Sequence, residues 1–100
     1  MKTVIETPTF AKLADKIWTE DERLDFISFI SNNPKAGDVI PNAEGARKIR
    51  WAVKGSGKRG GTRIIYFNLS DQGVIELIYI YKKVKQENMT ANDIKKVKRT

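Results

Sequence analysis

Three strand-like segments in the second half of the chain place the strongest constraint on its fold. Residues 46–53 alternate, with Ile49, Trp51 and Val53 on one side of the segment and Lys48, Arg50 and Lys54 on the other. Residues 61–69 are rich in β-branched and aromatic side chains, and residues 74–81 are apolar on both faces, as in a central strand. The four residues between these two segments predict a tight turn. We therefore expect a β-sheet in which one strand has a cationic face.

The first half of the chain predicts a short strand and two helices. Residues 3–6 are the candidate strand, and Thr7 followed by proline is a typical helix start. Apolar residues then recur at helical spacing: Phe10, Leu13, Ala14, Ile17 and Trp18. Thr19 and Glu22 have the spacing of a capping box that opens a second helix, and Asn33 before proline ends it. The two helices are expected to form an antiparallel hairpin.

These elements predict the order β-α-α-β-β-β, with residues 35–45 as a connecting loop and a short C-terminal helix that begins near Thr90. The expected class is α+β, with the N-terminal strand and the helix hairpin packed on a twisted antiparallel β-sheet. A chain of 100 residues suits one domain, which we expect to span residues 1–100.

The net charge of +7 is concentrated in one segment. Residues 45–70 hold seven basic residues and no acidic one: Arg47, Lys48, Arg50, Lys54, Lys58, Arg59 and Arg63. The remaining 12 basic residues equal the 12 acidic residues in number, so the excess charge lies in this segment alone. Such a concentration favours a surface that binds a polyanion such as nucleic acid.

The residue types that are missing exclude several kinds of site. The chain has no histidine and no cysteine, which excludes thiolate and imidazole zinc sites, cysteine nucleophiles and Ser-His-Asp triads. We expect no metal and no cofactor. The longest apolar run, residues 77–81, is too short to span a bilayer, and no signal sequence is evident. The expectation is a cytoplasmic protein with no membrane partner.

Residues 55–60, GSGKRG, match the glycine pattern of dinucleotide-binding loops. In those proteins a helix follows the glycines and its N-terminus holds the pyrophosphate. Here the strand-like residues 61–69 follow, so the segment is interpreted as a hairpin loop with Lys58 and Arg59 at its tip.

The span RKIRWAVKGSGKRGGTRIIYF, followed by VIELIYIYKK and preceded by the loop NPKAGD, resembles the RelE/HigB superfamily of bacterial toxins, and most closely its HigB-like branch. The resemblance covers nearly the whole chain. It implies a RelE-like fold and a toxin of a type II toxin-antitoxin system that cuts mRNA in the ribosomal A site. It also implies the partners, which are the small ribosomal subunit, the mRNA and a cognate antitoxin, here a HigA-like helix-turn-helix protein.

The resemblance also supplies the candidate catalytic residues, which are Lys48, Arg50, Arg63, Tyr81 and Lys83. It implies attack by the RNA 2′-hydroxyl on the neighbouring phosphate without a metal ion, which leaves a cyclic phosphate. Arg63 would hold the non-bridging oxygens, because guanidinium presents paired donors and stays charged. Lys48 is a candidate base, and Tyr81 or Lys83 would assist at the leaving oxygen.

A second set of basic residues is expected to bind RNA phosphates without taking part in the reaction: Arg47, Lys54, Lys58, Arg59 and Lys82. The chain lacks the tyrosine that RelE has near its C-terminal end, in the region of Asn88 and Met89, so the acid and the base stay unassigned. The alternative function is a non-catalytic module that binds RNA or the ribosome through the same basic face. A DNA-binding regulator is disfavoured, because the basic residues lie on strands and a loop, not on a recognition helix.

Overall fold

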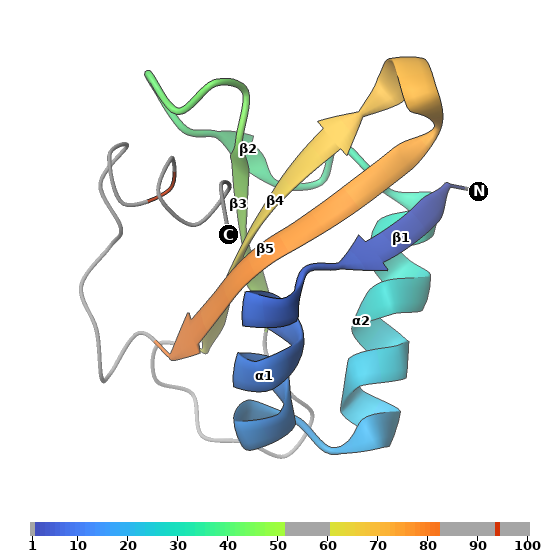
Figure 1. The fold of residues 1–100 in the computed structure, drawn as a ribbon, viewed down its shortest axis with the longest axis vertical. Coiled ribbons are helices and arrows are strands. Elements are labelled where there is room, and N and C mark those ends of the chain that lie inside the picture. The colour runs from blue at the N-terminus through green and yellow to red at the C-terminus, as the bar shows by residue number, and fades with distance from the viewer. Residues whose placement is uncertain (1, 52–60, 83–93, 95–100) are drawn as a thin grey trace.

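The computed structural model describes residues 2–51, 61–82 and 94 (Figure 1). The helices and strands in these ranges are β1 (Thr3–Glu6), α1 (Pro8–Ile17), α2 (Glu20–Asn32), β2 (Asp38–Val39), β3 (Arg47–Trp51), β4 (Thr62–Leu69) and β5 (Val74–Lys82). A single 3₁₀ turn, Ser70–Gln72, joins β4 to β5. The predicted α+β class and the order of the elements are confirmed, and one further strand, β2, lies in the region expected to be a loop.

The five strands form one sheet in the order β1-β5-β4-β3-β2. The strands β3, β4 and β5 pair in antiparallel fashion, as predicted, and the additional strand β2 is antiparallel to β3. In contrast, β1 pairs with β5 in parallel, so the sheet is mixed. Parallel neighbours need a long crossover between them, and the chain between β1 and β5 contains both helices and the other strands. The sequence pattern of residues 3–6 predicts a strand, but it does not predict whether this strand runs parallel or antiparallel to β5.

Both helices begin at side-chain caps that the sequence predicts. The Thr7 hydroxyl accepts a hydrogen bond from the Phe10 N–H at 3.3 Å and donates one to the Leu77 carbonyl at 3.0 Å, which ties the start of α1 to β5. At the start of α2, Thr19 and Glu22 form the reciprocal capping box with distances of 3.2 and 2.8 Å. The caps satisfy backbone donors that a helix end leaves without intrahelical partners.

The helices run antiparallel and cover one face of the sheet (Figure 1). A chain of aromatic rings crosses this interface: the centroid of Trp18 lies 5.3 Å from that of Phe26, and Phe26 lies 5.2 Å from Trp51 on β3. Phe29 also packs on Trp51, at 4.9 Å. The helix-side core therefore holds β3, the strand that carries the predicted cationic side chains.

The opposite face of the sheet has a second apolar cluster. It contains Ile65, Phe67, Ile78 and Tyr81 from β4 and β5, together with Ala43, Ala46 and Ile94. Both central strands are thus buried on both faces, as the sequence predicts for β5. Ile94 is helical and fully buried, and the rest of the predicted C-terminal helix lies outside the described residues.

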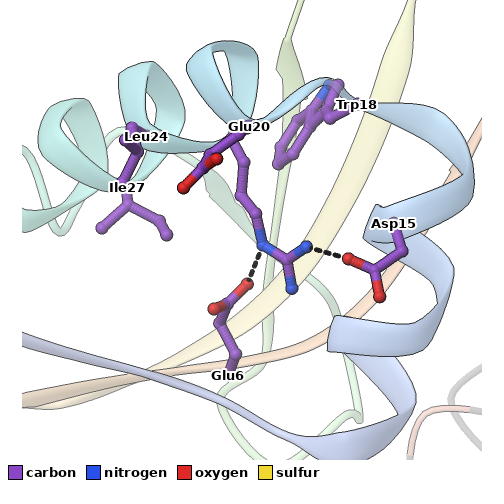
Figure 2. A pocket seen from close by; sticks show the side chains of 7 residues that line it. Glu6, Asp15, Trp18, Glu20, Leu24 and Ile27 are labelled. Atoms are coloured by element: carbon purple, nitrogen blue, oxygen red, sulfur yellow. Dashed lines mark hydrogen bonds and ion pairs between the residues drawn. The ribbon is translucent and has the colours of Figure 1, made fainter.

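A partly buried arginine, Arg23 of α2, forms ion pairs with Glu6 of β1 and Asp15 of α1, two residues that Figure 2 labels. Arg23 of α2 donates from Nε to Glu6 at 2.7 Å and from Nη1 to Asp15 of α1. Burial lowers the pKa of Arg23, but the hydrogen bonds to the two carboxylates outweigh it, and the pKa lies above its ordinary value. Arg23 therefore fixes the helix hairpin to the edge strand. Within the described ranges, no helix has the length and apolar character needed to cross a membrane.

Candidate functional site

Strand register brings three of the predicted catalytic residues into one row. Arg50 on β3 pairs with Arg63 on β4, and Arg63 pairs with Tyr81 on β5. Directly opposed residues of antiparallel strands share a face, and neighbouring strands lie about 4.8 Å apart. The row lies on the face away from the helices, because its neighbours along the strands, Ile49 and Ile64, belong to the helix-side core.

Lys48 lies in the next row on the same face. It precedes Arg50 by two positions on β3, and it pairs with Ile65 on β4 and with Asp38 on β2. Arg50 is exposed, and Lys48 and Arg63 are partly exposed. Three cationic side chains therefore cluster on one sheet face, where an RNA phosphate can meet more than one of them.

Tyr81 is in the row but buried, with only 3% of its surface exposed. Its ring lies 6.0 Å from that of Tyr79 and packs in the second apolar cluster. In this position Tyr81 packs in the apolar cluster and pairs across the sheet with Arg63 of β4. The predicted role of Tyr81 at the leaving oxygen stays a prediction and requires RNA to reach its hydroxyl.

The remaining predicted residues do not share this face or lie outside the described ranges. Arg47 alternates with Lys48, and its Nη1 donates to the carbonyl oxygens of Gly37 at 2.6 Å and Lys35 at 3.4 Å. Lys82 pairs with Thr62 and alternates with Tyr81, so it also projects from the helix-side face. Lys54, Lys58, Arg59 and Lys83, and with them the GSGKRG segment, lie outside the described residues.

A hydrogen-bond network anchors the loop that leads into β2. The Tyr66 hydroxyl accepts from the Gly37 N–H at 2.9 Å and donates to the Pro34 carbonyl at 2.9 Å, while Arg47 holds the Gly37 carbonyl. Tyr66 itself is fully buried. The network therefore fixes the position of β2 against β3 although β2 has only two residues.

Tyr66 predicts how stability falls at alkaline pH. Burial raises the pKa of Tyr66 above its ordinary value of 10.0, and the Gly37 hydrogen bond and Arg47 oppose this only in part. Above pH 10 an unfolded tyrosine ionises while Tyr66 stays neutral, so the stability present below pH 10 is lost as the pH rises towards the folded pKa.

Ultraviolet titration of the folded protein should show a late tyrosine ionisation, above the ordinary pKa of 10.0, that comes from Tyr66. In a Tyr66→Phe variant this late step should be missing. Persistence of the late step in that variant would mean that another tyrosine is responsible.

Asp38 lies in the region that the sequence predicts to be a loop, whereas β2 places Asp38 beside Lys48 at the edge of the cationic face. The only local signal is the pair Val39-Ile40, which is too short to identify a strand.

A cavity of about 430 Å³ lies elsewhere, between β1 and the helices, and is lined in part by Trp18, Glu20 and Leu24 (Figure 2). Arg23 with its two carboxylates occupies one side of this cavity. The cavity is on the helix side of the sheet, and none of the predicted catalytic residues lines it.

No protein-family model matches the sequence. Among solved structures, the isolated E. coli RelE toxin aligns with a TM-score of 0.63 and 16% identity over 99% of this chain and 98% of that one. The chain has the RelE fold. RelE in the intact E. coli RelBE toxin-antitoxin complex aligns with a TM-score of 0.61 and 15% identity, over 82% of this chain and 96% of that one.

A free-state E. coli RelE variant with two arginines replaced by alanine also shares the RelE fold, with a TM-score of 0.61, 15% identity and coverage of 86% and 87% of the two chains. The resemblance seen in the sequence is thus confirmed for the fold. The assignment to the HigB-like branch stays a prediction.

Proposed function

We propose that this protein is the toxin of a type II toxin-antitoxin system and cuts translated mRNA in the ribosomal A site. The observation that carries the proposal is the pairing of Arg50 with Arg63, beside Lys48, on the sheet face away from the helices of a RelE fold. Paired guanidinium groups suit a phosphate that gains charge during a reaction, because each presents several donors and stays charged.

The reaction would proceed without a metal ion. The 2′-hydroxyl attacks the adjacent phosphorus, the bond to the 5′-oxygen breaks, and the products are a cyclic phosphate and a free 5′-hydroxyl. Arg63, with Arg50 opposite it, stabilises the charge on the non-bridging oxygens. Lys48 takes part in proton transfer, and Tyr81 or Lys83 assists at the leaving oxygen.

The proposed partners follow from the same function. The similar RelE structure in complex with RelB supports a protein antitoxin, which we expect to be HigA-like. The small ribosomal subunit and the mRNA would contact the basic residues outside the catalytic row: Arg47, Lys54, Lys58, Arg59 and Lys82. Action on translating ribosomes places the protein in the cytoplasm.

The test is a reconstituted translation reaction in which mRNA ends are mapped by primer extension. Cuts are expected within translated codons and only when ribosomes are present. An Arg63→Ala variant should cut about 10²–10³-fold more slowly, because one stabiliser of the transition-state charge is lost. It should still bind ribosomes, since the other basic residues remain.

Lys12→Ala is the matched control, since it removes one positive charge from an exposed position of α1. This variant should cut like the parent. Ribosome binding without any cut would favour the alternative, a non-catalytic module that binds RNA or the ribosome. Equal rates for Arg63→Ala and the parent would remove Arg63 from the catalytic set.

A further inference from the structure

We propose that Asp38 is the general base that takes the proton from the 2′-hydroxyl, with Lys48 as its acid counterpart. This inference rests on the proposed function and assigns the acid–base pair that the sequence leaves open. Its first support is the register: Asp38 on β2 is directly opposite Lys48 on β3. Opposed residues of this kind have Cβ atoms about 4.5–5.5 Å apart on one face of the sheet.

The same register places Asp38 diagonally across from Arg50. Arg50 is two positions beyond Lys48 on β3 and pairs in turn with Arg63. Such diagonal neighbours lie about 7–8 Å apart, within reach of long side chains. A phosphate held between the two arginines would therefore have a carboxylate and an amine next to it on the side of β2.

Asp38 is also available for proton transfer. Its side chain is exposed and forms no hydrogen bond or ion pair within residues 2–51 and 61–82. Other carboxylates have structural roles: Glu6 and Asp15 bind Arg23, and Glu22 caps α2. A carboxylate oxygen can accept the proton of a hydroxyl group, whereas a lysine ammonium has only donors.

Gly37, the residue before Asp38, has side-chain hydrogen bonds in addition to the backbone pairing of the short edge strand β2. Both backbone groups of Gly37 are hydrogen-bonded: its carbonyl accepts from Arg47, and its N–H donates to the Tyr66 hydroxyl. A Cβ atom at Gly37 would lie 2.8 Å from the Lys48 carbonyl oxygen, so the two strands approach closely here. Catalytic side chains need such support, because small displacements of the reacting groups are costly.

The proton balance of the reaction closes within this pair. The Asp38 carboxylate accepts the proton of the 2′-hydroxyl as the oxygen forms its bond to phosphorus. As the bond from phosphorus to the 5′-oxygen breaks, the Lys48 ammonium donates a proton to that oxygen. The protonated carboxyl and the neutral amine are then neighbours, and transfer of one proton between them restores the starting state.

The decisive variant is Asp38→Asn, which keeps the size of the side chain and removes its ability to accept the proton. Cleavage in the reconstituted translation reaction should fall by about 10²-fold or more, while ribosome affinity stays equal or rises. A higher ribosome affinity would follow because the variant lacks a negative charge that repels the RNA phosphates. Asp38→Glu, which keeps the carboxylate but moves it, should retain an intermediate rate.

Asp25→Asn on α2 serves as the matched control, since it removes the same charge from an exposed helix position. It should cut at the parental rate, and thermal unfolding should show all variants to be folded. An Asp38→Asn variant that cuts as fast as the parent, or faster, would overturn the inference while leaving the proposed function intact. A parent that binds ribosomes but does not cut would overturn the proposed function and this inference with it.

Discussion

Replacing Phe26 by alanine is expected to lower the free energy of unfolding by about 3–5 kcal/mol, because a large buried ring is lost and a cavity remains. Phe26 is fully buried, and its ring is the link between Trp18, at the end of α1, and Trp51 on β3. Domains of this size are stable by about 5–15 kcal/mol, so the loss is a large part of the total.

Urea unfolding measures the effect of this change. The midpoint for Phe26→Ala should fall sharply, and cleavage should fall with it at temperatures where the variant unfolds. Leu24→Ala on the same helix is the control, since Leu24 is 54% exposed and should change stability by less than about 0.5 kcal/mol. If both variants unfold at the same urea concentration, the aromatic chain does not hold the helices on β3.

Replacing Gly37 by alanine is expected to have the second large effect, about 2–4 kcal/mol, from overpacking and weakened hydrogen bonds together. The added Cβ would lie 2.8 Å from the Lys48 carbonyl oxygen and 3.0 Å from the Tyr66 ring and hydroxyl. Since the Lys48 carbonyl belongs to the backbone of β3, β2 has to move away. The variant should therefore lose cleavage as well as stability, because Asp38 moves with β2.

Gly45→Ala separates this clash from a simple change of glycine. Gly45 has open space around its Cβ position and a φ of 90°, so its substitution adds only backbone strain of about 1–2 kcal/mol. Cleavage measured below the unfolding temperature should stay near the parental rate in Gly45→Ala and fall in Gly37→Ala. Equal cleavage by both variants would show that the position of β2 does not matter for the reaction.

Features that depend on near neighbours could be predicted from the sequence. The caps at Thr7 and Thr19 act over three residues, and the burial of β5 on both faces follows from its continuous apolar run. The alternation along β3 placed Lys48 and Arg50 together correctly. The same alternation places Arg47 on the other face of β3, where it donates to the Gly37 carbonyl. The prediction that Arg47 binds RNA rests on its charge and not on this alternation.

Features that depend on distant pairing could not be predicted. The parallel direction of β1 and the position of β2 beside Lys48 are set by residues far away in the sequence, and two residues carry too little pattern to mark a strand. The burial of Tyr81 depends on Ala43, Ala46 and Ile94, which cover that face of β5. An apolar pattern on both faces of a strand predicts that both faces are buried, but it does not predict which residues cover them.

The parallel pairing of β1 with β5 has a consequence for how the protein is made. Thr3 pairs with Val74, and the Thr7 backbone N–H donates to the Leu77 carbonyl, so β1 has its partner only when β5 has emerged from the ribosome. Contacts between such distant segments form late and slow the folding of a chain. A nascent chain that lacks β5 therefore contains β3 and β4, whose pairing aligns Arg63 with Arg50, but it lacks Tyr81 and the partner strand of β1. The complete row and its attachment to the helix hairpin arise only after β5 has been added.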